Sequence, residues 1–254
     1  MEHRNKKQIK SFSNKLGWDS DAERLILYAD FMGFTHRVLS NDHSKLKGQL
    51  NEFKAKWTKK MEPLQTGDHL RFVQFSDSIL IVANGIDEQM FNLISKAAIN
   101  LVHAAMSLKF PIKGVIAQGT FSFDKKNELY FGRPLVDAYL LHEHIKYYGI
   151  VVHNTAERTV KNFQNRNNPY IHSEIYIDKG KVSHYHLCWN LINTQLSADD
   201  ITPQCLEWLE LIEEDVSGEP RQYIDRTKEV LQNNVEYSSP NSDDVSLVKD
   251  STSQ

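Results

Sequence analysis

Cysteine and long apolar runs are both scarce in this 254-residue chain. Cys188 and Cys205 are its only thiols, too few for the disulfide framework of a small secreted domain, so a reducing, cytoplasmic location is expected. No apolar run approaches the ~20 residues of a bilayer-spanning helix, and the polar, basic residues 1–15 lack the apolar centre of a signal peptide. We therefore expect no membrane association.

A strong charge of one sign and the common nucleotide and hydrolase motifs are also missing. The formal net charge is −3, which gives no dominant attraction to nucleic acids or membrane surfaces, so no direct nucleic-acid partner is expected. There is no G-x-x-x-x-G-K-[ST] loop and no G-x-S-x-G elbow. A composition with 40% hydrophobic residues is that of an ordinary globular chain, sufficient for one large domain or a domain with appendages.

Two aspartates stand out because they interrupt apolar runs. Residues 25–29 form an apolar run that stops at Asp30, and Asp77 lies between residues 72–76 and another apolar run. Such runs predict buried strands, in which an uncompensated charge is costly. Two carboxylates on neighbouring strands can share Mg²⁺ or Mn²⁺, and two ions about 4 Å apart would hold the attacking and leaving oxygens of a phosphoryl displacement. A lone Asp at a strand end is more often a turn former or a helix N-cap, but the pair favours the metal site.

Strands and helices alternate along the predicted chain. We expect strands at 24–30, 68–83 (a hairpin bending at 76–78), 112–123, 128–131 and 150–152, and helices at 32–60, 87–109 and 135–148. A hairpin at 171–189 and helices at 203–216 and 220–235 follow. This order predicts an α/β sandwich, a sheet covered by helices. The expected organisation is a loose arm over 1–20, a catalytic domain over 21–154, a hairpin-and-helix extension packed on it over 155–237, and a disordered tail over 238–254.

The residues around the two aspartates resemble the metal-binding motifs of class III nucleotide cyclases. Residues 29–35, Ala-Asp-Phe-Met-Gly-Phe-Thr, resemble the first motif, and residues 75–78, Phe-Ser-Asp-Ser, resemble the second. Residues 114–119 and 131–139 resemble the strand and the helix start that follow, so the resemblance extends from about residue 25 to residue 152. It implies the ferredoxin-like sheet of those enzymes and a homodimer in which one subunit supplies the metals and the other the base pocket.

The resemblance also implies a role for each site residue. Asp30 and Asp77 would bind two Mn²⁺ or Mg²⁺ ions, with the backbone carbonyl of Phe31 as a further ligand. The reaction would be attack of the ribose 3′-oxygen on the α-phosphorus, with loss of pyrophosphate. The turn that binds the triphosphate through free backbone N–H groups at a helix start would consist of Phe31, Met32, Gly33, Phe34 and Thr35.

Val73 and Leu129 stand where purine cyclases have polar residues that read the base. Neither can hydrogen-bond a base edge, so adenylyl or guanylyl activity is not expected. Arg71 and Phe75 share the strand face of Val73 and Asp77, and Arg71 could donate to a pyrimidine O2 or O4, although a solvated strand-edge charge is an equal alternative. The chain resembles most the pyrimidine cyclases of bacterial antiphage (Pycsar) systems. This implies a uridylate cyclase, or alternatively a cytidylate cyclase, whose cyclic product activates a separate effector.

The positions expected to stabilise the transition state depart from the family pattern. Many class III enzymes have Asn and Arg where this chain has Val136 and Leu140, and a missing cation at developing charge would raise the barrier. Arg133 and Lys146 are candidates to replace it. The alternatives are a degenerate cyclase fold that binds nucleotide without turnover, and an interaction module that uses the cyclase-like half as a scaffold.

A separate metal hypothesis concerns the second half of the chain. His184, His186 and Cys188 share one face of a predicted strand and could ligate a soft metal. Packing on the strand face is the simpler interpretation, because no fourth ligand has a suitable spacing.

Overall fold

The computed structural model describes residues 17–18, 21–64, 68–163, 169–191 and 201–238, so most of the predicted arm and nearly all of the predicted tail lie outside the described residues. The described part forms one mixed sheet in the order β2-β3-β1-β4-β6-β8-β7, with β5 paired to β4. The β4–β6 pair is parallel and the other named pairs are antiparallel. The strands are β1 (Ala22–Phe31), β2 (Leu70–Phe75), β3 (Ser78–Ala83), β4 (Ile112–Asp124), β5 (Leu129–Gly132), β6 (Gly149–Val152), β7 (Tyr170–Ile177) and β8 (Gly180–Leu187).

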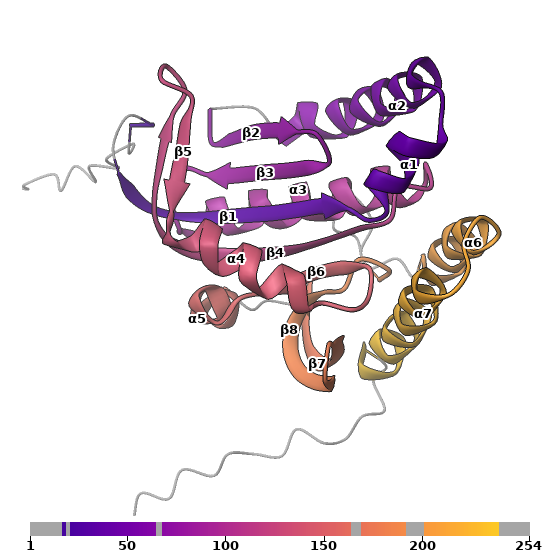
Figure 1. The fold of residues 1–254 in the computed structure, drawn as a ribbon. Helices are drawn as coiled ribbons and strands as arrows, with labels where there is room; N and C mark the ends of the chain where they lie inside the picture. Colours follow the sequence, from indigo (N-terminus) through magenta and orange to yellow (C-terminus); the bar gives the residue numbers. More distant parts are fainter. Residues whose placement is uncertain (1–16, 19–20, 65–67, 164–168, 192–200, 239–254) are drawn as a thin grey trace, which may run out of the picture.

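Helices cover both faces of this sheet, as the predicted α/β sandwich requires. The helix α3 lies behind β1 and β3, whereas α4 crosses the opposite face over β1 and β4 (Figure 1). The helices are α1 (Phe34–Ser40), α2 (His43–Met61), α3 (Glu88–Met106), α4 (Arg133–His144), α5 (Asn154–Asn162), α6 (Thr202–Glu213) and α7 (Glu219–Ser238), with a 3₁₀ turn η1 (Glu62–Leu64). None of the helices in the described part of the chain combines the length and apolarity needed to cross a membrane.

The strand β1 sends alternate side chains to the two faces, and this alternation sets the position of the site. Its odd-numbered residues over 25–31 are buried in the core that includes α2 and α3. Ile26 is buried on the opposite face together with Ala138 of α4. Because side chains alternate along a strand, Tyr28 and Asp30 belong to this second face, which we call the α4 face.

The helix predicted over 32–60 is in fact two helices. Asn41 has extended backbone angles, φ −109° and ψ 152°, which end α1. The carboxylate of Asp42 then accepts hydrogen bonds from the backbone N–H groups of Ser44 and Lys45, and so caps the start of α2. The apolar spacing of the segment was helical throughout, so the prediction missed the break.

The hairpin predicted over 171–189 forms β7 and β8 and extends the same sheet, because His186 of β8 pairs with Val151 of β6. Helices α6 and α7 pack on each other beside this end of the sheet (Figure 1). The helix α5 was not predicted, since its segment is polar and Asn-rich. The helix expected over 135–148 ends earlier, at His144, where the extended Ile145 bridges to Ile177.

Candidate active site

The two aspartates predicted to bind metal lie next to each other at one end of the sheet. Asp30 is the penultimate residue of β1 and pairs across the ladder with Ser78 of β3. Asp77 lies in the turn between β2 and β3, at the bend predicted for residues 76–78. The N–H of Phe31 donates to the carbonyl oxygen of Asp77 over 3.3 Å, which ties the end of β1 to that turn. The register of β1 and β3 therefore brings the predicted pair together.

The carboxylate of Asp30 is destabilised where it stands. Burial is the main cause and the charge of Asp77 the next, and together they raise the pKa of Asp30 to about 6. The hydroxyl of Ser78 donates to Oδ1 of Asp30 over 3.0 Å, and this bond and the charge of Lys113 lower the pKa against those effects. Two partly buried carboxylates that repel each other gain from a bound cation. The pair thus fits Mg²⁺ or Mn²⁺, since Mg²⁺ takes one or two carboxylates together with substrate phosphates.

Lys113 is a charged neighbour of the site that the sequence prediction missed. It is the cross-strand partner of Asp30 on β4, and residues directly opposite in an antiparallel pair have Cβ atoms about 5 Å apart. Its ammonium group is buried and donates to the carbonyl oxygen of Ile145 over 3.3 Å. Burial lowers the pKa of Lys113. Its place opposite Asp30 depends on the strand register, which the sequence does not state.

The turn predicted to bind phosphate is only partly available for that role. The N–H of Met32 donates to the carbonyl oxygen of Pro111 over 2.8 Å, and that of Phe31 is bound to Asp77. The side chain of Phe31 is buried against the ring of Phe110, with centroids 5.1 Å apart. The prediction that residues 31 and 32 offer free N–H groups is therefore wrong.

The second half of the same turn retains the predicted character. Gly33 adopts the left-handed conformation, φ 71°, and is the N-cap of α1. Phe34 and Thr35 are the first residues of this seven-residue helix, where backbone N–H groups have no acceptor within the helix. Any phosphate contact from this turn therefore has to come from residues 33–35.

The predicted base-reading residues of β2 lie on the α4 face at different distances from the aspartates: Phe75 is two residues before Asp77, and Arg71 is the furthest along the strand. Val73 pairs with Leu80 and packs in the core of that face, and Phe75 at the end of the strand is 82% exposed. Arg71 lies four residues before Phe75, about 13 Å along the strand at ~3.3 Å per residue. Its guanidinium group forms a 2.8 Å ion pair with Asp68.

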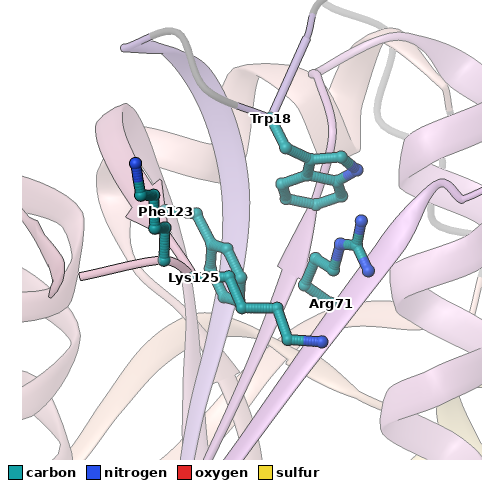
Figure 2. Close-up of a pocket in the computed structure, with 5 residues that line it drawn as sticks. Trp18, Arg71, Phe123 and Lys125 are labelled. Atoms are coloured by element: carbon teal, nitrogen blue, oxygen red, sulfur yellow. The ribbon is translucent and has the colours of Figure 1, made fainter. Parts of the chain in front are cut away.

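A cavity of about 460 Å³ opens beside Arg71, and neither aspartate of the pair lines it. Figure 2 shows the indole of Trp18 above the guanidinium group of Arg71, with Lys125 reaching across the opening. The guanidinium carbon of Arg71 lies 5.2 Å from the centre of the Trp18 ring, which is within the range of a cation–π contact. The cavity combines aromatic and cationic walls; its lining residues are Trp18, Arg71, Phe123, Lys125 and Lys126.

The two candidate transition-state cations do not join the aspartates of their own chain. Arg133 is paired with Asp137 over 3.4 Å and follows Gly132, which pairs with Phe121 of β4. Phe121 is eight residues along β4 from Lys113, the partner of Asp30, or about 26 Å at ~3.3 Å per residue. Lys146 binds Asp178 over 2.8 Å. Arg133 therefore cannot reach the pair within the same subunit in this conformation, whereas Lys146 is engaged by Asp178 and interacts electrostatically with Lys113, the neighbour of Asp30.

The soft-metal hypothesis for the second half of the chain is wrong. In the described part of the chain, no group of three or more His, Cys, Asp or Glu side chains is arranged to hold a metal ion. Instead, His186 shares a 2.8 Å hydrogen bond with the hydroxyl of Ser173, and the thiol of Cys188 donates to the side-chain oxygen of Asn190. These side chains pack and hydrogen-bond within the fold.

Large apolar side chains are exposed along β2, β5 and α4. Exposed apolar side chains can mark an interaction surface where they adjoin one another. We call this set the apolar patch; its members are Phe75, Leu129, Phe131, Val136, Tyr139 and Leu140.

Comparison with solved structures gives the fold a name. No family model and no curated protein sequence matches the chain. The catalytic core of a rhodopsin-guanylyl cyclase with converted specificity, in complex with ATPαS, superposes with a TM-score of 0.51 at 11% identity, over 66% of this chain and 96% of that one. The non-canonical dimeric guanylyl cyclase domain of the RhoGC fusion protein from the aquatic fungus Blastocladiella emersonii also gives 0.51, at 12% identity, over 66% and 94%.

The chain has the fold of a class III nucleotide cyclase catalytic domain. This confirms the predicted fold class, with the two aspartates at one end of its sheet. At this level of identity the likeness establishes the architecture alone.

Proposed function

We propose that this chain is a nucleotide cyclase that converts a pyrimidine nucleoside triphosphate, UTP by preference, into its 3′,5′-cyclic monophosphate and pyrophosphate. The observation that carries the proposal is the adjacency of Asp30 and Asp77 on a sheet of the cyclase fold. A raised pKa at Asp30 supports it, because strongly perturbed carboxylates cluster at functional sites.

The carboxylates of Asp30 and Asp77, with the carbonyl oxygen of Phe31, would hold two Mn²⁺ or Mg²⁺ ions. When bound, such ions lower the proton affinity of the 3′-hydroxyl and neutralise the triphosphate. The chain itself fixes the carboxylates through the β1–β3 register and the hydrogen bond from Phe31 to the turn. The N–H groups of Phe34 and Thr35 at the start of α1 add contacts to the phosphates.

The proposal includes a homodimer, because the aspartate pair and the cavity beside Arg71 lie apart within one subunit. The aspartate pair carries negative charge at one end of the α4 face, and the cavity beside Arg71 is cationic. The apolar patch lies on elements of the same region. In a two-fold dimer the same patch serves both subunits, and an antiparallel arrangement sets the acidic end of each against the cationic cavity of its partner. A nucleotide at Asp30 would then meet Arg71 of the partner subunit.

The choice of a pyrimidine rests on what surrounds the base in such a dimer. The partner's Val73 and the partner's Leu129 are apolar and give no polar contact to a purine edge. The partner's Arg71 supplies only donors, which match the carbonyl oxygens of a pyrimidine. UTP and CTP share O2, so CTP is the alternative substrate. With the resemblance to Pycsar cyclases, we propose that the cyclic product serves antiphage signalling through a separate effector.

A second candidate function is nucleotide binding without turnover. It is favoured by Val136 and Leu140, which stand where cyclases have transition-state residues, and by the ion pairs that engage Arg133 and Lys146. A site without a cation at the developing charge loses much of its rate enhancement. In a dimer, Arg133 of the partner subunit remains available to fill this role.

One experiment separates these possibilities. The purified protein is incubated with Mn²⁺ and each of the four labelled ribonucleoside triphosphates, and the products are separated. Cyclic UMP or cyclic CMP with stoichiometric pyrophosphate is the expected result, whereas cyclic AMP or cyclic GMP would contradict the base-pocket argument. Mn²⁺-dependent nucleotide binding without product selects the binding module, and no binding of any nucleotide contradicts both functions.

A further inference from the structure

The hydrogen bonds behind Asp30 form a short chain on the α4 face. The hydroxyl of Ser78 lies 3.0 Å from Oδ1 of Asp30, and the hydroxyl of Tyr28 lies 3.3 Å from that of Ser78. Tyr28 and Asp30 are two residues apart on β1, and Ser78 is the cross-strand partner of Asp30. Three side chains on two strands are thus connected by two hydrogen bonds.

The donor of each bond follows from the chemistry of the groups. An ionised carboxylate only accepts, so Ser78 gives its single hydroxyl proton to Asp30. The oxygen of Ser78 can then only accept from Tyr28, whose phenol donates. Successive hydrogen bonds in a partly buried setting polarise each other, which strengthens the bond that reaches the carboxylate.

The ring of Tyr28 is held in place by α4. It makes edge-on contacts with the ring of His142, centroids 5.3 Å apart, and with the ring of Tyr139, centroids 6.0 Å apart. His142 is buried, and Tyr139 belongs to the apolar patch. The phenol of Tyr28 therefore has a fixed position from which to support Ser78.

We propose that Ser78 and Tyr28 are positioning residues that hold Oδ1 of Asp30 and so present Oδ2 to the metal ions. This inference rests on the proposed function, since it assigns a role toward the same ions. In the described part of the chain, Ser78 binds Oδ1 and no residue donates a hydrogen bond to Oδ2, so that oxygen is the one left for a cation. Partners that orient a metal ligand commonly change metal affinity by about 10–100-fold when removed.

The test measures Mn²⁺ binding to the metal-free full chain by calorimetry and by electron paramagnetic resonance, without nucleotide. Ser78→Ala is expected to weaken Mn²⁺ binding about 10–100-fold, and Ser78→Thr, which keeps a hydroxyl, to restore it. Tyr28→Phe removes the more remote bond and is expected to weaken binding by a smaller factor, about 2–10-fold. The Mn²⁺ concentration for half-maximal turnover should rise in the same order.

Matched controls come from the same sheet. The hydroxyl of Ser122 donates to the carboxylate of Asp21, and the phenol of Tyr176 donates to the carboxylate of Glu229, both away from the aspartate pair. Ser122→Ala and Tyr176→Phe delete the same chemical groups and should leave Mn²⁺ binding unchanged. If the substitutions acted only through a general loss of stability, Mn²⁺ binding would weaken in all four variants alike. Ser78→Thr would then not restore it.

The outcomes separate this inference from the proposed function. If the unmodified protein binds Mn²⁺ and forms a cyclic nucleotide while Ser78→Ala and Tyr28→Phe bind Mn²⁺ equally well, the positioning role is wrong and the function stands. If the unmodified protein binds no Mn²⁺ with or without nucleotide, both are overturned. If Ser78→Ala does not fold, Tyr28→Phe and Ser78→Thr still decide the matter by their Mn²⁺ affinities.

Discussion

Asp30 is a carboxylate held where a neutral side chain would be more stable. It is the penultimate residue of a strand whose other residues are mainly apolar, and it faces the charge of Asp77. The hydroxyl of Ser78 and the neighbouring ammonium group of Lys113 offset part of this cost. A residue whose charge is costly in the absence of a partner is a good candidate for a ligand of one.

Removing either charge should abolish turnover without unfolding the protein. Asp30→Asn and Asp77→Asn keep the side-chain shape, and each is expected to lower kcat by about 10²–10³-fold or more, as loss of one charge-stabilising group does. Steady-state assays with Mn²⁺ and UTP measure this. Asp225→Asn, on the exposed face of α7, is the control and should retain full activity. Full activity in either site variant would show that the metal assignment is wrong.

The raised pKa of Asp30 predicts a specific pH dependence in the metal-free protein. The folded pKa is about 6 and the ordinary value is 3.8, so between them the folded state holds more protons than the unfolded state. The stabilisation from protonating Asp30 is present below the ordinary value and is lost as pH rises through about 6. Thermal unfolding should show this loss in the unmodified protein but not in Asp30→Asn.

The metal reverses that trend, because protons and Mn²⁺ compete for the same carboxylate. Mn²⁺ should stabilise the protein above the pKa of about 6 and lose this effect as the pH falls through it. The account is contradicted if the stabilisation by Mn²⁺ depends on pH in the same way in the unmodified protein and in Asp30→Asn.

At the residue scale, the sequence revealed the aspartates but not their surroundings. Asp30 and Asp77 could be predicted because a charged residue after an apolar run can be recognised from the sequence alone. Lys113, Ser78 and Trp18 join the site region only through register and packing. Nothing in the local sequence around Lys113 says which residue of β1 lies opposite.

At the scale of elements, the site depends on how closely β1 approaches β4. Gly114 of β4 lies opposite Ala29, one residue before Asp30. A Cβ atom there would lie 2.6 Å from the carbonyl oxygen of Tyr28 and 2.8 Å from the Cβ of Ala29. Both contacts involve β1, so any added side chain has to displace the strand that carries Asp30 and Tyr28.

A substitution at Gly114 should therefore damage both stability and the site. Gly114→Ala is expected to lower the free energy of unfolding by about 1–3 kcal/mol through overpacking, and to weaken Mn²⁺ binding, as measured by denaturant unfolding and calorimetry. Gly48→Ala in α2 is the control, because a Cβ there meets no atom within 4 Å; it should stabilise the protein by about 0.5–1 kcal/mol. Equal stability of the two variants would show that the β1–β4 approach is not tight.

Most elements could be predicted from local patterns, and the failures have physical causes. The alternation of β1 and the β2–β3 hairpin are visible in the sequence because each depends on neighbouring residues. The break between α1 and α2 was missed because the apolar spacing continues across Asn41 and Asp42. The joining of β8 to β6 pairs residues far apart in the chain, which no local pattern specifies.

At the scale of the whole molecule, the proposed site would be complete only in a dimer. The described chain exposes the apolar patch and separates the aspartates from the cavity beside Arg71. An isologous interface would cover the patch and bring the aspartate pair of each subunit to the cavity of the other, once on each side of the two-fold axis.

A charge placed in the apolar patch should therefore abolish dimer and turnover together. Leu140→Glu on α4 is expected to give a monomer by light scattering and to lose cyclase activity, because burying an unpaired charge is costly. Leu211→Glu on α6 introduces the same charge at another exposed leucine and should leave both properties intact. A monomeric Leu140→Glu protein with full turnover would rule out the shared site.

The most direct measurement is a crystal structure of the protein with Mn²⁺ and a non-cyclisable UTP analogue, with anomalous scattering used to locate the metal. The account predicts anomalous peaks within bonding distance of the carboxylates of Asp30 and Asp77, with the base of the analogue against Arg71 of the partner subunit. Peaks that avoid both aspartates, or a nucleotide bound elsewhere, would contradict it.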